Sequence, residues 1–176
     1  RLDIMNQLDF FATGEAGQRK IAHPGTFNAN PLSAVTGSKA LEILGGSDIC
    51  VKVNEKGEQF RQQLNQVLAD LKLKWAVYGT YSGFHLFTNA QNRNIESVNF
   101  DPTEIPLSEL TENDATILPP LRLALLINGI DTSPRFSGFL SASHGATELE
   151  QTAAAFRRAL ELLIDEGIVE TPWLKN

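Results

Sequence analysis

Apolar positions recur at helical spacing between residues 54 and 73. The stripe is formed by Phe60, Leu64, Val67, Leu68 and Leu71. Side chains three and four positions apart share one face of a helix, so this segment predicts an amphipathic surface helix. The short apolar run before it, residues 49–53, fits either a turn of helix or a short strand, and Gly45-Gly46 marks a break ahead of that run.

A second helical stripe lies near the end of the chain. It is formed by Leu149, Ala153, Phe156, Leu160 and Leu163. The hydroxyl of Thr147 suits an N-cap, so we expect the last helix to begin there. A shorter apolar helix is expected at residues 121–128, where Gly129 is well placed as the residue that follows the C-cap.

In residues 75–88 apolar and polar positions tend to alternate, and the segment is rich in aromatic and β-branched side chains. This pattern predicts two strands that pair in antiparallel fashion, with glycines at Gly79 and Gly83. His85 lies between Phe84 and Leu86, so it projects from the opposite strand face. We expect it to be exposed or hydrogen-bonded and not a metal ligand. Residues 136–143 predict one more strand.

The connection between these strands and the short helix, residues 90–120, is polar and acidic and contains prolines. Long connections of this kind serve as lids, as interface loops or as disordered segments. Its carboxylates predict a solvated acidic face, because nothing nearby would raise the pKa of one above that of its neighbour. The carboxylates concerned are Glu104, Glu109, Glu112 and Asp114.

Composition describes a soluble globular protein, with 42% hydrophobic and 20% charged residues. The net charge of −6 argues against nucleic acid and an anionic membrane surface as partners, and no run approaches the roughly 20 apolar residues of a membrane span. No metal, nucleotide or serine-hydrolase motif is found. The single cysteine, Cys50, fits a reducing compartment and is expected to be a small apolar residue in its run and not a nucleophile.

Residues 23–33, HPGTFNANPLS, lead into an apolar helical run that extends to about residue 44. Asn30 suits the N-cap and Pro31 the first helical turn. Gly25 allows close backbone approach, and Thr26 adds a hydroxyl donor. Such a loop directs free N–H groups and the positive end of a helix dipole to one place, so it can hold an anion; the alternative is an ordinary capped helix after a turn.

The string at residues 25–33, GTFNANPLS, resembles the "GT(F/L)(S/N)(G/A)NPL(A/S)" segment of class III pyridoxal-phosphate aminotransferases, particularly those similar to glutamate-1-semialdehyde 2,1-aminomutase. A second stretch at residues 125–144 carries LLINGI, SP and GFLSASH, and it is similar to the family's "LL..GV…PS…GF.SAAH". The two stretches follow each other in the family order. The resemblance therefore covers nearly the whole chain.

The order of the predicted elements suggests an α+β domain with a small antiparallel sheet covered by helices. The resemblance implies the same fold, as the C-terminal small domain of a fold-type I pyridoxal-phosphate-dependent transferase. Residues 1–45 would be the end of the large domain and the interdomain helix, and residues 46–176 the small domain.

The resemblance also implies pyridoxal phosphate as the cofactor and a homodimer, with Gly25 and Thr26 at the cofactor phosphate and Thr26 reaching the site of the neighbouring subunit. The family's Schiff-base lysine lies shortly before the point where this chain begins, so we expect a fragment with no catalytic residue of its own. Lys20 is not expected to replace it, because Arg19 and a polar stretch keep its amine protonated. The full-length protein would interconvert amine and carbonyl groups of a small-molecule amino substrate in the cytoplasm.

Substrate choice depends on Arg135, the one cation beside the second motif. Its guanidinium could clamp a carboxylate bidentately, or it could be a surface arginine in a turn. Where the aminomutase pattern has an acidic residue, this chain has the neutral Phe136-Ser137-Gly138, which leaves a general amino-acid or ω-aminotransferase open beside an aminomutase. The competing interpretation is a non-catalytic α+β module that self-associates through its apolar stripes.

Overall fold

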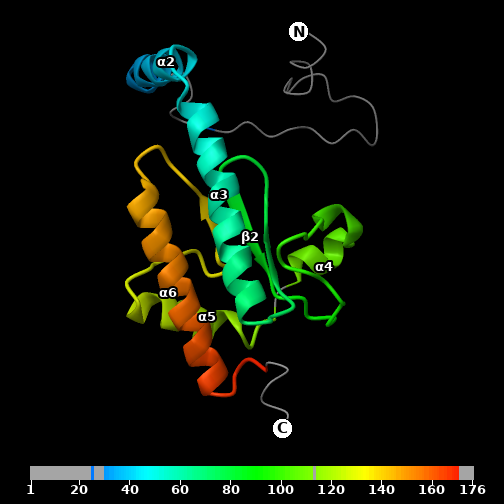
Figure 1. Cartoon of the computed structure of the whole chain (residues 1–176). Coiled ribbons are helices and arrows are strands. Elements are labelled where there is room, and N and C mark those ends of the chain that lie inside the picture. Colours follow the sequence, from blue (N-terminus) through cyan, green and yellow to red (C-terminus); the bar gives the residue numbers. More distant parts are fainter. Residues whose placement is uncertain (1–24, 26–29, 113, 171–176) are drawn as a thin grey trace. The chain divides into compact units, whose positions relative to one another are not determined.

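The computed structural model of the protein describes residue 25, residues 30–112 and residues 114–170. The chain divides into two compact units, residues 1–46 and residues 47–176. Figure 1 shows the helices and strands coloured along the sequence. Within the described part of the chain, no helix is both long enough and apolar enough to cross a membrane.

The described part of the first unit is mainly one helix, α2 (Pro31–Gly45). Its beginning is as predicted: Asn30 is the N-cap and Pro31 occupies the first turn, where a missing backbone N–H costs nothing. It ends at the predicted pair of glycines, where the Gly46 N–H donates to the Glu42 carbonyl at 3.0 Å. All its residues are exposed within the described structure, including its leucines, Val35 and Ile43.

The second unit begins with α3 (Ile49–Asp70), a single helix where the sequence predicted a separate short element followed by a helix at residues 54–73. Of the two alternatives for residues 49–53, the helical one is confirmed, since no glycine or proline interrupts the run. An ion pair between Lys52 and Asp48, at 2.9 Å, links the first turn to the N-cap residue. Cys50 lies in this turn and is exposed.

The end of α3 comes earlier than predicted. Leu71 caps the helix, and Lys72 adopts a left-handed backbone at φ 54°, which turns the chain toward the sheet. The predicted apolar stripe does face the core, where Phe60, Leu64, Val67 and Leu68 are buried and Leu71 is partly buried.

The sheet has three antiparallel strands in the order β1-β2-β3: β1 (Ala76–Tyr78), β2 (Gly83–Phe87) and β3 (Ser137–Phe139). The predicted pair of strands at residues 75–88 is confirmed, with Val77 opposite Leu86. The strand predicted at residues 136–143 is shorter, because Phe136 has a positive φ of 47° and residues after Leu140 turn toward the last helix. In β2, His85 is exposed between buried neighbours, as expected.

The second unit also contains the helices α5 and α6, and the first residue of each differs from the predicted one. Helix α5 (Leu118–Ile127) starts three residues before the predicted start, because two prolines fit a first helical turn; its end is as predicted, with Gly129 at φ 85°. Helix α6 (Ala146–Asp165) is capped by Gly145 and not by Thr147. The Glu148 carboxylate accepts the Gly145 N–H at 2.8 Å and so links the first turn of the helix to its N-cap residue.

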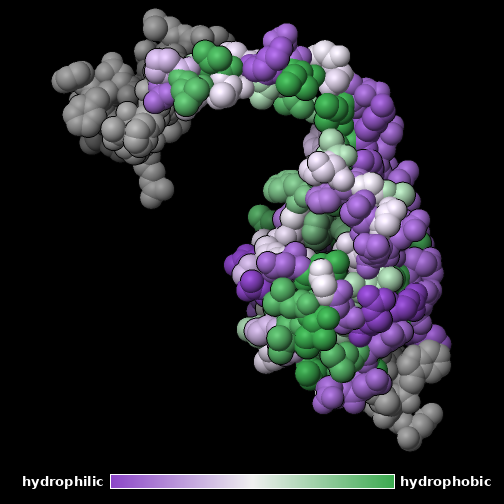
Figure 2. Space-filling view, turned by 90° about the vertical axis from the view of Figure 1, so that its left-hand side faces the viewer, coloured by the Kyte–Doolittle hydropathy of each residue, from purple (hydrophilic) through white to green (hydrophobic). Residues whose placement is uncertain are grey.

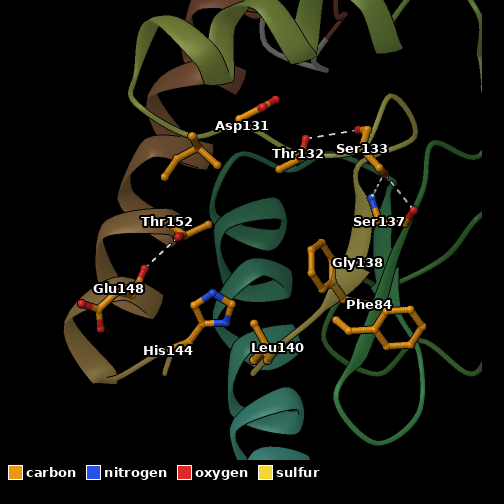
Figure 3. A pocket seen from close by; sticks show the side chains of 12 residues that line it. Phe84, Asp131, Thr132, Ser133, Ser137, Gly138, Leu140, His144, Glu148 and Thr152 are labelled. Carbon is orange, nitrogen blue, oxygen red and sulfur yellow. Dashed lines mark hydrogen bonds between the residues drawn. The ribbon is translucent and has the colours of Figure 1, made fainter. Parts of the chain in front are cut away.

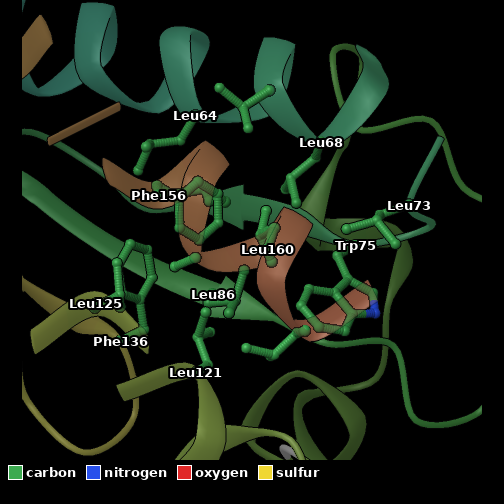
Figure 4. Close-up of a cluster of buried hydrophobic side chains, with 14 of the residues drawn as sticks. Leu64, Leu68, Leu73, Trp75, Leu86, Leu121, Leu125, Phe136, Phe156 and Leu160 are labelled. Atoms are coloured by element: carbon green, nitrogen blue, oxygen red, sulfur yellow. The ribbon is translucent and has the colours of Figure 1, made fainter. Parts of the chain in front are cut away.

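The core lies between α3, α6, α5 and the sheet (Figure 4). Leu64 and Leu68 from α3 meet Phe156 and Leu160 from α6, over Leu86 from β2. The predicted stripe of α6 is therefore confirmed as a core face. The long connection between β2 and α5 contains a short 3₁₀ helix (Pro102–Glu104) and α4 (Leu107–Thr111), which cover a second small cluster around Phe87.

Candidate functional site

The residues expected to contact a cofactor phosphate are Gly25 and Thr26. Gly25 is exposed, and Thr26 lies outside the described residues, as does Lys20. Their roles stay predictions.

The amino end of α2 is already occupied by its own cap. The side-chain oxygen Oδ1 of Asn30 accepts the N–H of Leu32 at 2.9 Å and that of Ser33 at 3.4 Å. Two of the orphan donors of the first turn thus have a partner within the chain. Within the described residues this end of α2 has the contacts of an ordinary capped helix, and the phosphate contact stays a prediction.

Arg135, the expected substrate cation, lies in a tight turn ahead of β3. The turn is closed by the Phe136 N–H, which donates to the Ser133 carbonyl at 3.0 Å. Pro134 occupies the second position of this turn, where its fixed φ is favourable. Arg135 is exposed, and within the described part of the chain it forms no hydrogen bond or ion pair.

Phe136, next to Arg135, is buried to 2% exposure although its backbone is left-handed. Its ring stacks on Phe156 of α6 with ring centroids 4.8 Å apart and meets Phe84 of β2 edge-on at 5.7 Å. Its carbonyl accepts the Leu86 N–H at 3.2 Å. The residue beside the candidate cation is thus fixed to a helix and a strand at once.

A depression of about 280 Å³ lies beside this turn. Figure 3 shows residues Asp131, Thr132 and Ser133 along one side, β3 along another, and His144, Glu148 and Thr152 opposite. Most of the second family-like stretch, from Ile130 to His144, therefore gathers around one hollow. Its wall from α6 was not predicted, because Glu148 and Thr152 reach the hollow only through the packing of the helix on the sheet.

The histidine of that stretch has a structural partner. His144 Nδ1 accepts the Ser141 N–H at 3.0 Å, which leaves the proton of the neutral ring on Nε2. The ammonium group of Lys56 in α3 donates hydrogen bonds to the His144 carbonyl at 2.7 Å and to the Ala142 carbonyl at 3.2 Å. These contacts hold the segment between β3 and α6 in place.

Two carboxylates of the long connection, Glu109 and Asp114, have lowered pKa values. Glu109 is held by both Arg93 Nε and Nη2 at 2.6 Å, and this hydrogen-bonded pairing lowers the pKa of Glu109 below its usual range. The Thr116 hydroxyl and backbone hydrogen bonds lower the pKa of Asp114 in the same way. A general acid needs a raised pKa, so neither group suits that role.

Metal ligation has no support in the described ranges. No group of three or more histidine, cysteine, aspartate or glutamate side chains converges there. His85 lies against the Tyr78 ring at a centroid distance of 5.4 Å.

No model of a known protein family matches the chain. The chain is 29% identical over 164 residues to the glutamate-1-semialdehyde 2,1-aminomutase of Methanocella arvoryzae, a match that covers 91% of this chain and 34% of that protein. Several other archaeal proteins with the same name match it over similar lengths, among them one from Methanothrix thermoacetophila at 30% identity.

Solved structures agree. A transaminase with pyridoxal phosphate bound superposes with a TM-score of 0.65 at 25% identity, over 93% of this chain and 34% of that one. An ω-transaminase from Sphaerobacter thermophilus superposes with a TM-score of 0.59 at 28% identity, over 81% of this chain and 30% of that one. The chain is thus similar to a C-terminal portion of pyridoxal-phosphate aminomutases and transaminases, and it spans about a third of their length.

Proposed function

We propose that this chain is the C-terminal part of a pyridoxal-phosphate-dependent class III aminotransferase or aminomutase, which interconverts amine and carbonyl groups of a small-molecule amino substrate. The observation that supports it most is the match over 91% of the chain to proteins named as such aminomutases. The α+β fold with its three-stranded antiparallel sheet supports the same portion of a transaminase.

Within this proposal, residues 1–45 are the end of the large domain and the interdomain helix, and residues 46–176 form the small domain. Gly25 and Thr26 hold the cofactor phosphate of the neighbouring subunit in a homodimer. When bound, pyridoxal phosphate supplies an electron sink for the reaction. The lysine that carries it and the acid that faces its ring nitrogen belong to the two thirds of the relatives that this chain does not span.

Arg135 is the residue proposed to bind the substrate. A planar guanidinium with two free N–H edges binds a carboxylate in a bidentate manner, and this residue is exposed with its charge not neutralised by a neighbour in the described structure. Its function would be to orient an amino substrate that carries a carboxylate. Both an aminomutase and an intermolecular aminotransferase have such substrates, so the proposal covers both.

Homodimer formation and a cytoplasmic location complete the proposal. Exposed apolar side chains of α5 and of the segment after α6, among them Leu123, Ile127 and Ile168, support burial of this surface against another subunit. Figure 2 shows an area of apolar residues on the surface of the second unit. The single cysteine fits a reducing compartment.

The test is the visible absorbance of the full-length protein incubated with pyridoxal phosphate, before and after borohydride, beside the same test on this chain alone. A band that borohydride abolishes in the full-length protein, with the cofactor then retained after denaturation, is expected together with its absence in this chain. No band in either sample would overturn the proposal and favour the self-association module.

A further inference from the structure

We propose that the turn of residues 133–137 holds the backbone of Arg135 in a fixed position. Ser133 and Phe136 are then positioning residues for this arginine, which binds the carboxylate of the substrate. This inference rests on the proposed function and adds to it the residues that fix the cation. It starts from one observation: the exposed arginine stands between two residues whose contacts leave them little freedom.

The first fixed point is the aromatic ring of Phe136. It is packed between Phe156 and Phe84, at ring distances of 4.8 and 5.7 Å, and is only 2% exposed. Its backbone nevertheless stands at φ 47°, a region that residues with a Cβ rarely adopt. Strained backbone of this kind persists only where the surroundings over-determine it, and it gathers at functional sites.

The left-handed backbone has a geometric consequence for Arg135. Because the ring of Phe136 enters the core, the preceding residue is left on the outer side of the turn, where the structure shows it exposed. The Phe136 carbonyl, bonded to the Leu86 N–H, ties this arrangement to the central strand of the sheet. The backbone that carries the guanidinium is thus fixed on one side.

The second fixed point is the hydroxyl of Ser133. Its Oγ accepts the Ser137 N–H at 3.0 Å and lies 3.0 Å from the Ser137 Oγ, so the two ends of the turn are joined across Arg135 (Figure 3). The Ser133 carbonyl closes the same turn by accepting the Phe136 N–H. The turn is therefore held by side chain and backbone together.

The charges near the turn leave Arg135 available to an anion. Of the two carboxylates that line the hollow, Asp131 is 3.7 Å from the guanidinium of Arg122 and Glu148 accepts the Gly145 N–H. No carboxylate pairs with Arg135 in the part of the chain that the structure describes. Because the turn fixes the backbone at Arg135, only the side chain remains to be ordered when the guanidinium binds a carboxylate in a bidentate manner.

The experiment compares two amino donors on the full-length enzyme, an amino acid and the amine that remains without its carboxylate: 3-amino-3-phenylpropanoate and 1-phenylethylamine. The variants are Arg135→Ala, Ser133→Ala, Ser133→Thr and the double variant of Arg135→Ala with Ser133→Ala. Ser133→Ala removes the hydroxyl without opening the core, so it leaves the fold in place. Ser108→Ala, an exposed serine of α4, is the matched control.

We expect Arg135→Ala to raise KM for the amino acid about 10- to 100-fold, the usual weight of a charge-assisted bidentate contact. Ser133→Ala should raise it about 3- to 10-fold, with kcat nearly unchanged, and Ser133→Thr should restore it. In the double variant the serine change should have no further effect, because it acts only through the arginine. KM for the amine should not change in any variant.

Two results would overturn the inference: an equal loss with both donors in Ser133→Ala, which marks a general structural role, or no effect on the amino acid. The proposed function fails separately, if the full-length protein shows no pyridoxal-phosphate band that borohydride abolishes. An enzyme that turns over neither donor is compatible with an aminomutase. In that case the Arg135 Nε–H resonance is followed during titration with 3-phenylpropanoate. A change in chemical shift that is smaller in Ser133→Ala than in wild type supports the positioning role of Ser133. No change in wild type overturns the inference.

Discussion

Gly57 of α3 lies directly against the carbonyl of Tyr81, in the turn between β1 and β2. A Cβ built on Gly57 would stand 2.2 Å from the Tyr81 oxygen and 2.8 Å from the Ser82 Cα, both rigid backbone atoms. The absence of a side chain at this one position lets the helix approach the hairpin. Arg61, one turn later, donates to the Tyr81 and Gly83 carbonyls at 2.8 Å and fixes the same turn.

Gly57→Ala should therefore destabilise the protein although alanine is the better helix former. The helix and the hairpin must move apart, and overpacking of this kind costs about 1–3 kcal/mol. Gly37→Ala is the matched control, since Gly37 is also helical and a Cβ there meets nothing within 4 Å. Urea unfolding of both variants measures the difference. Equal midpoints for Gly57→Ala and wild type would contradict the close approach.

Asn65 is the second link between α3 and the sheet, and it is buried. Its side-chain amide donates to the Val77 carbonyl at 2.9 Å and accepts the Val77 N–H at 2.7 Å. Asn65→Ala would leave both backbone groups without a partner, so we expect a loss of about 2–4 kcal/mol in the free energy of unfolding. Gln59→Ala, at an exposed position of the same helix, should change it by less than about 0.5 kcal/mol. Similar losses in the two variants, measured by urea unfolding, would rule out this role.

The pairing of Glu109 with Arg93 predicts a pH dependence. The hydrogen bonds from Arg93 hold the pKa of Glu109 below 4.5, its ordinary value in the unfolded chain. A carboxylate with a lowered folded pKa contributes stability that is fully present above that ordinary value and is lost as the pH falls through the folded pKa. Glu109→Gln should thus be less stable than wild type at pH 7.

At an acidic pH well below 4.5 the difference between Glu109→Gln and wild type should shrink, because the stability from the lowered pKa is lost as the wild-type carboxylate becomes protonated. Urea unfolding at both pH values checks this, with Glu104→Gln as the control, since Glu104 is exposed and lies in the same connection. A difference of the same size at the two pH values would show that the ion pair is not its source.

The periodicity of the sequence was sufficient to predict the elements that form the core. The stripes of α3 and α6 and the hairpin of β1 and β2 appear where the spacing of apolar residues placed them, because burial of one face determines both patterns. The α+β class followed from their order.

The boundaries and the strained positions could not be predicted in the same way. Gly145, and not Thr147, caps α6 because the Glu148 carboxylate reaches its N–H, a choice among neighbouring residues that propensity does not decide. The left-handed backbone of Phe136 follows from contacts with Phe84 and Phe156, which are distant along the chain. Local sequence favours an ordinary strand there.

The candidate site shows the same division. Arg135 could be singled out from the sequence as the cation beside a motif, whereas the Ser133–Ser137 contact depends on the conformation of the turn and the hollow walled by Glu148 depends on the packing of α6. The contacts of Thr26 lie outside the described residues, so the cofactor site rests on the resemblance.

Mixed dimers of the full-length protein test directly whether Thr26 serves the cofactor site of the neighbouring subunit. One subunit carries Thr26→Val and keeps its cofactor lysine, and the other lacks that lysine and keeps Thr26. If Thr26 serves the neighbouring subunit, one of the two sites in the mixed dimer is intact. Activity should then reach about half that of wild type, although each parent dimer is impaired.

If Thr26 instead serves its own subunit, mixing cannot assemble a complete site from these two parents. If Thr26 has no cofactor contact, the Thr26→Val parent dimer keeps full activity and mixing adds nothing. In either case the mixed dimer is no more active than the average of the parent dimers, which would rule out a contact across the interface. The fraction of mixed dimers, purified by two different affinity tags, sets the scale for either outcome.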